Sequence, residues 1–172
     1  LQVTSCVFTG STSADINTFG NTFNHDVTIR DCRFTSNGTP GFSVLLQLAR
    51  VRIESNWFSG YKSGAVAVSI FLGQCTDAVV RGNTILDTNR AIRVDTPDGP
   101  HLVEGNSMIC ETDNVGYTGV IVIAATEMTS SSTRVIGNHA EGFHNDPGLV
   151  GAEGHGFAVL RVADISFVGN SA

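Results

Sequence analysis

Apolar and polar residues alternate over short stretches along the whole chain, and one eight-residue phrase recurs. Its copies are LQVTSCVF at 1–8, VTIRDCRF at 27–34, VRIESNWF at 51–58, AVVRGNTI at 78–85, HLVEGNSM at 101–108, TRVIGNHA at 133–140 and ISFVGNSA at 165–172. Such alternation is typical of β-strands whose two faces meet different surroundings. No stretch carries the i, i+3, i+4, i+7 stripe of an amphipathic helix, so the pattern predicts strands and turns without a long helix.

Three positions of the phrase are nearly constant. The third is always apolar and predicts one buried column: Val3, Ile29, Ile53, Val80, Val103, Val135 and Phe167. The fifth is small or turn-forming: Ser5, Asp31, Ser55, Gly82, Gly105, Gly137 and Gly169. The sixth is asparagine or cysteine: Cys6, Cys32, Asn56, Asn83, Asn106, Asn138 and Asn170. Since an asparagine amide can both donate and accept, stacked copies predict an internal ladder, with Cys32 continuing it below Asn56.

A second set of short, β-branched strands is expected between the phrases, at 43–48, 65–71, 91–94, 119–125 and 156–162. A repeat of about two dozen residues cannot bury a core alone, so it must stack on its neighbours. The repeat therefore predicts a solenoid in which each strand lies above the equivalent strand of the previous coil.

The phrase V-x-I-x-x-N-x-F, followed by a glycine-led strand, resembles the pectin-lyase-like superfamily over nearly the whole chain. The resemblance implies an all-β, right-handed parallel β-helix of about seven coils with an Asn ladder at one turn. Residues 1–172 are expected to form a single β-helix domain or a fragment of a longer solenoid. Since phage tailspikes, surface adhesins and polysaccharide-processing enzymes share this fold, fold alone does not choose the function.

Composition narrows the classes of partner. The 172 residues include 41% hydrophobic and 15% charged residues, which suits one folded domain. The formal charge of −6 argues against a nucleic-acid duplex as partner. No apolar run reaches 18 residues, so membrane insertion is not expected. The sequence contains no nucleotide-binding, phosphate-loop or EF-hand motif, so no cofactor is expected. The cysteines (Cys6, Cys32, Cys75 and Cys110) lack a C-x-x-C spacing and are interpreted as small buried side chains, with their disulfide state left open.

Residues 137–157 concentrate chemistry-bearing side chains, namely His139, Glu141, His144, Asp146, Glu153 and His155. Gly154-His155-Gly156 resembles a polygalacturonase motif, and Asn145-Asp146-Pro147 resembles part of an alginate epimerase motif. These resemblances make His155 and Asp146 weak catalytic candidates, because the accompanying aspartate pairs are absent. The spacing matches no zinc signature, so we expect residues 139–154 to form a solvated surface loop without tightly bound metal.

A second candidate is the pair Arg93 and Asp95. If Ile92 and Val94 face inward, both charged side chains face outward, because side chains alternate along a strand. An outward arginine beside a carboxylate could hold a uronic-acid carboxylate and assist proton abstraction. The competing interpretation is an ordinary exposed ion pair.

A third candidate is the surface column that follows each ladder position. It predicts an exposed Trp57, with Arg33 one coil below, Thr84 one coil above and Tyr61 nearby. An exposed indole suits the apolar face of a sugar ring, so Trp57, Arg33 and Tyr61 form the candidate carbohydrate-binding set. A subunit interface and a covering loop are the open alternatives for Trp57.

The resulting hypothesis is a structural or carbohydrate-recognising β-helix module of a phage tailspike, fibre or surface adhesin. It implies an extracellular or virion-surface location, a polysaccharide or cell-surface glycan as partner, and a homotrimer. The alternative is a secreted polysaccharide lyase, glycoside hydrolase or uronate epimerase. Lys62 is the single lysine, which counts against lyases that use lysine as base. The residues leave open whether the chain is catalytic.

Overall fold

The chain is an all-β parallel solenoid in the computed structural model, and the part of it described here contains no helix. The structure describes residues 1–10, 13–18, 25–36, 41–47, 49–61, 67–95, 99–111, 118–123, 129–130, 132–143 and 155–172. The pattern of short alternating strands is therefore confirmed as the basis of the fold.

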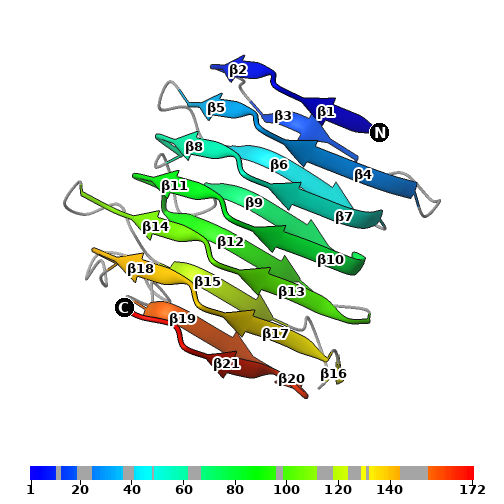
Figure 1. The fold of residues 1–172 in the computed structure, drawn as a ribbon, viewed down its shortest axis with the longest axis vertical. Helices are drawn as coiled ribbons and strands as arrows, with labels where there is room; N and C mark the ends of the chain where they lie inside the picture. The colour runs from blue at the N-terminus through cyan, green and yellow to red at the C-terminus, as the bar shows by residue number, and fades with distance from the viewer. Residues whose placement is uncertain are drawn as a thin grey trace.

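Three parallel sheets run along the solenoid, and the chain visits them in turn (Figure 1). Sheet 1 contains β1 (Gln2–Thr4), β4 (His25–Arg30), β7 (Ala49–Glu54), β10 (Thr76–Arg81), β13 (His101–Glu104), β17 (Thr133–Ile136) and β21 (Ser166–Val168). Sheet 2 contains β2 (Val7–Thr9), β5 (Arg33–Thr35), β8 (Trp57–Ser59), β11 (Thr84–Leu86), β14 (Ser107–Ile109) and β18 (His139–Glu141). Sheet 3 contains β3 (Ala14–Asn17), β6 (Phe42–Gln47), β9 (Val68–Gly73), β12 (Arg90–Asp95), β15 (Thr118–Ile123) and β19 (His155–Leu160). An additional pair joins β16 (Thr129–Ser130) to β20 (Val162–Ala163).

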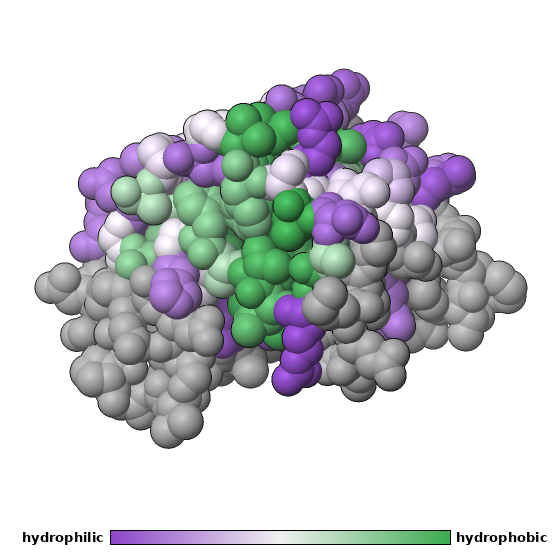
Figure 2. All heavy atoms as spheres, turned by 90° about the horizontal axis from the view of Figure 1, so that it is seen from below, coloured by the Kyte–Doolittle hydropathy of each residue, from purple (hydrophilic) through white to green (hydrophobic). Residues whose placement is uncertain are grey.

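The apolar third position of the phrase forms one inward column on sheet 1. Its members pair strand by strand in the order Val3, Ile29, Ile53, Val80, Val103, Val135 and Phe167. The five central side chains are at most 1% exposed, so the predicted burial is confirmed for them. Val3, in the first strand of the sheet, is only partly buried. The prediction is wrong for Phe167, which is 38% exposed because β21 is the last strand of sheet 1 in the described part of the chain. Figure 2 shows this end of the molecule, where apolar side chains gather at the centre.

The fifth and sixth positions build the turn between sheets 1 and 2. All seven fifth-position residues have a positive φ, from 54° at Ser5 to 61° at Gly82 and Gly169. Glycine tolerates this left-handed backbone, whereas Ser5, Asp31 and Ser55 adopt it at a steric cost. The following residue turns its side chain inward, and Asn56, Asn83, Asn106 and Asn138 are each at most 2% exposed.

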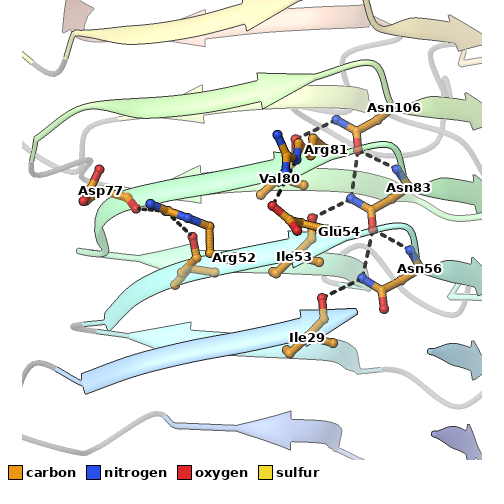
Figure 3. A network of polar contacts seen from close by, with 11 residues as sticks. Ile29, Arg52, Ile53, Glu54, Asn56, Asp77, Val80, Arg81, Asn83 and Asn106 are labelled. Carbon is orange, nitrogen blue, oxygen red and sulfur yellow. Dashed lines mark hydrogen bonds and ion pairs between the residues drawn. The ribbon is translucent and has the colours of Figure 1, made fainter. Parts of the chain in front are cut away.

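The buried asparagines bond directly to one another (Figure 3). The side-chain Nδ2 of Asn83 donates to Oδ1 of Asn106 at 2.9 Å and to the Ile53 carbonyl at 3.0 Å. Oδ1 of Asn83 accepts from both the backbone N–H and Nδ2 of Asn56, each at 3.0 Å. Each amide thus joins the coils below and above it. Cys32 extends the column, since its backbone N–H donates to Oδ1 of Asn56 at 3.0 Å.

Aromatic stacking adds to the packing beside this column. Phe8, Phe34 and Phe58 lie on successive strands of sheet 2, and both neighbouring pairs have ring centroids 4.7 Å apart. Their planes differ by 4° and 6°. The spacing equals the distance between paired strands, so the backbone register sets the ring geometry.

The cysteines act mainly as small core side chains. Cys32, Cys75 and Cys110 are buried, which confirms the prediction for these three, and Cys6 is exposed. No two of the four cysteines are joined in a disulfide bond in this structure. Cys6 belongs to the coil of β1, which has a neighbouring strand on one side, and this accounts for its exposure.

Substituting Ile53 by aspartate is expected to unfold the protein, because an unpaired carboxylate would be desolvated in the core. Ile53 is 0% exposed, whereas Val7 is 71% exposed on the outer face of sheet 2. Val7→Asp makes a comparable change at the surface and is expected to leave the fold intact. Circular dichroism and urea unfolding distinguish the two variants, and a folded Ile53→Asp protein would contradict the assigned register.

Candidate functional site

The residue after each ladder position points outward on sheet 2. Arg33, Trp57 and Thr84 pair on successive strands, so the predicted column is confirmed. The Arg33 guanidinium carbon lies 4.2 Å from the centre of the Trp57 ring system. A cation at this distance over an indole contributes about 0.5–1 kcal/mol at an exposed site. Arg33 therefore holds the indole and covers one of its faces.

Trp57 and Tyr61 both differ from the sequence-based expectation. Trp57 is half-buried rather than fully exposed, because the side chain of Arg33 lies against it. Its neighbour on the other side is Thr84, whose short side chain covers little of an indole. Tyr61 does not share this surface, since it is only 4% exposed and packs in the hydrophobic core. A surface contact between a glycan and the Tyr61 ring is therefore not supported.

Tyr61 instead bonds to the half-buried side chain of Asp15 on β3. Its hydroxyl donates to Oδ2 of Asp15 at 2.5 Å, although the two residues are 46 positions apart in the chain. Burial raises the pKa of Asp15 above its usual value of 3.8, and the hydrogen bond from Tyr61 opposes this shift. Burial also raises the pKa of Tyr61, as does the adjacent carboxylate. The hydrogen bond between Tyr61 and Asp15 links β3 to the segment that follows β8.

Arg93 and Asp95 face outward together on β12, as expected. Arg93 Nε donates to Oδ1 and Nη2 to Oδ2 of Asp95, both at 2.7 Å. The guanidinium also lies 5.3 Å from the ring centre of Phe71 on the neighbouring strand β9. Both side chains are largely covered, with 28% of Arg93 and 23% of Asp95 exposed. The arginine fork is therefore occupied by its own neighbour.

The structure does not bring His155 to the Arg93–Asp95 pair. His155 starts β19, where it pairs with Thr118, and Thr118 pairs in turn with Arg90. His155 thus lies two strands away from β12 and three residues along from Arg93. Strand geometry places the Cα atoms of His155 and Arg93 roughly 14 Å apart. Asp146, His144 and Glu153 lie outside the described residues.

The prediction of a surface loop over residues 139–154 is wrong for its first three residues, because His139 lies on strand β18 (His139–Glu141). Its Nδ1 lies 2.9 Å from the Ser171 hydroxyl, and its Nε2 lies 3.2 Å from Oε2 of Glu141. Both partners of that ion pair are well exposed. Over the described ranges, no three His, Cys, Asp or Glu side chains are grouped so that they could hold a metal ion.

An arginine-rich surface on sheet 1 was missed by the sequence reasoning. Two neighbouring hollows, of about 290 and 330 Å³, lie over β1, β4, β7 and β10 and share Thr28 and Arg52 in their walls. The other lining residues include Arg30, Arg50, Asp26 and Glu54. A signal was present, because Thr28, Arg30, Arg52 and Glu54 occupy outward positions of two copies of the phrase, and Asp26 and Arg50 directly precede those copies.

Comparison with known proteins adds no relative. No family model, no curated protein and no solved structure matches the chain. In the parts of the chain described above, no helix has the length and apolar character needed to cross a membrane.

Asp15→Asn is expected to change the pH dependence of stability. Because the folded-state pKa of Asp15 is raised, its contribution to stability is complete below the unfolded pKa and is lost as the pH rises through the folded pKa. The advantage of the Asn variant over wild type should therefore be larger at pH 7 than at pH 4. Urea unfolding at both pH values measures this, and an advantage that grows on acidification would contradict the burial of this carboxyl group.

Proposed function

We propose that this chain is a carbohydrate-recognising β-solenoid module and that Trp57 with Arg33 contacts the glycan. The observation that carries the proposal is the partly exposed indole, held by Arg33 at 4.2 Å on the outer face of a parallel sheet. An aromatic face of this kind suits the C–H side of a pyranose ring.

Short polar side chains next to Trp57 support a sugar ligand. The column continues through Thr84 and Ser107, and the neighbouring outward positions include Thr35 and Ser59. Hydroxyl groups both donate and accept hydrogen bonds, as the hydroxyls of a sugar do. Their small size leaves the surface beside the indole flat.

The more detailed assignment is a right-handed, pectin-lyase-like β-helix of about seven coils, from a phage tailspike, fibre or surface adhesin. Crossover connections between parallel strands of one sheet are right-handed in about 98% of cases, which supports the handedness. The repeated asparagine turn supports the family resemblance. An extracellular or virion-surface location and a homotrimer belong to the same proposal.

The enzymatic alternative has weaker support. A lyase or epimerase needs a free arginine or base at the scissile bond, but the Arg93 fork already binds Asp95 at two points. His155 lies on a strand two positions away from this pair. The geometry of Arg93 and Asp95 therefore favours a structural ion pair over a proton-transfer site.

Trp57 gives the test a direct signal, since it is the single tryptophan of the chain. We expect glycans that bind on an array of microbial and host polysaccharides to change the intrinsic fluorescence of the protein. Trp57→Ala should leave the fold intact and weaken binding by about 5- to 150-fold, the effect of losing an aromatic anchor worth about 1–3 kcal/mol.

Val7→Ala, two strands away in the same column, is the matched control and should bind nearly as wild type, because this exposed side chain has no hydrogen-bonding group. Light scattering tests the alternative that Trp57 lies in a subunit interface. A Trp57→Ala protein that changes its oligomeric state, or that binds every glycan as wild type does, would refute the proposed site.

A further inference from the structure

The two hollows on sheet 1 form one continuous polar surface. The first is lined by Asp26, Val27, Thr28, Arg50, Arg52 and Asp77. The second is lined by Gln2, Thr4, Thr28, Arg30, Arg52 and Glu54. Each volume is near the lower limit of small-molecule sites, and together the hollows extend over four strands.

Some of the charges on this surface are already paired. Arg50 binds Asp26 through two hydrogen bonds of 2.8 and 3.1 Å, and Arg81 binds Glu54 at 3.0 Å. Within the described ranges, Arg30 and Arg52 form no ion pair. Counted with Arg81, four arginines (Arg30, Arg50, Arg52 and Arg81) face three carboxylates (Asp26, Glu54 and Asp77), so the surface carries a net charge of +1, although the whole chain has a formal charge of −6.

Arg52 is held in place by backbone groups instead of a carboxylate (Figure 3). Its Nη1 donates to the Asp77 carbonyl at 2.8 Å and to the Val51 carbonyl at 3.1 Å. The side chain is half-buried and lines both hollows. A guanidinium fixed by one nitrogen retains further N–H donors, which suits bidentate recognition of an oxyanion.

Arg30 supplies a second cation a short distance away. It pairs with Glu54 across the sheet and so lies one strand before Arg52 and two residues further along the strand. Strand geometry places the two Cα atoms about 8 Å apart. Thr28, Gln2 and Thr4 line the same surface and offer neutral hydrogen-bonding groups. Glu54 also lines this hollow, but its charge is neutralised by Arg81. Two cations beside neutral hydrogen-bonding groups are complementary to a polymer that carries both anionic groups and hydroxyls.

We propose that this surface binds an acidic polysaccharide, with carboxylate or sulfate groups at Arg30 and Arg52. The inference deepens the proposed function by naming the class of glycan, although it rests on a different surface from Trp57. Arg30 ends β4 and Arg33 begins β5, so the two surfaces adjoin across a two-residue turn. One chain of sugars can thus reach both.

The experiment uses three polymers with one backbone: dextran, carboxymethyl-dextran and dextran sulfate oligomers. Isothermal titration at low and moderate salt should show binding of at least one charged oligomer, weaker as salt increases, and no comparable binding of neutral dextran. The carboxymethyl and sulfate arms identify which anionic group is preferred. Arg52→Gln and Arg30→Gln are each expected to weaken binding of the charged oligomer about tenfold or more.

Arg134→Gln is the matched control. Arg134 is exposed and occupies the same outward row of sheet 1 as Arg52, three strands away, and does not line either hollow. The Arg134→Gln substitution removes the same charge and should alter binding less than about twofold, because salt strongly screens the interaction between charges roughly 14 Å apart. Arg30→Gln protects the test against misfolding, since the exposed Arg30 side chain can be shortened without loss of core packing.

Three results would overturn the inference: equal losses in Arg52→Gln and Arg134→Gln, equal binding of neutral dextran, or no binding of either charged oligomer. A changed oligomeric state in folded Arg52→Gln protein would also overturn it in favour of a subunit interface. Trp57→Ala, run in the same series, separates the two proposals. Loss of binding in Trp57→Ala alone refutes the acidic-glycan surface, whereas loss in the arginine variants alone supports it and shows that the charged oligomer binds without Trp57.

Discussion

Buried asparagine side chains hold the successive coils of this solenoid in one register. Each central amide accepts from the coil before it, donates to the asparagine of the coil after it, and donates to a backbone carbonyl. A slip of one residue would leave these buried groups without partners, at a cost of about 1–3 kcal/mol for each. Hydrophobic columns supply most of the driving force for stacking, but apolar contacts alone are not directional.

The outer surfaces depend on that register. Because side chains alternate along a strand, a fixed inward column of Ile29, Ile53 and Val80 also fixes what faces outward beside it. Arg33 therefore lies next to Trp57 on sheet 2, and Thr28 next to Arg52 on sheet 1. The two proposed glycan-contacting surfaces follow from the same stacking of coils and meet at the turn between sheets 1 and 2.

Much of the fold could be predicted from the sequence because the repeat is local. An apolar third position, a turn-forming fifth and an asparagine sixth specify strand, turn and inward side chain within eight residues. The seven positive φ values at the fifth position confirm the turn predicted there. Phe167 was wrongly expected to be buried, because its phrase matches the others while its strand has one neighbour.

The candidate sites were less predictable, because they depend on contacts between coils rather than on the phrase. Tyr61 lies in a less regular segment, so its inward orientation toward Asp15 carried no local signal. The hollows around Arg52 combine residues from four strands, and their depth depends on side-chain lengths across neighbouring coils. The pairing of Arg33 with Trp57 was predictable because both occupy the same position of the phrase.

Hydrogen exchange of the asparagine side-chain amides, followed by NMR, tests this dependence on register most directly. The Nδ2 protons of Asn83 and Asn106 are buried and doubly hydrogen-bonded, so they should exchange far more slowly than a free amide. Those of Asn170, which is only partly buried, should exchange faster. Exchange of all these amides at the rate of a solvent-exposed asparagine would contradict the account.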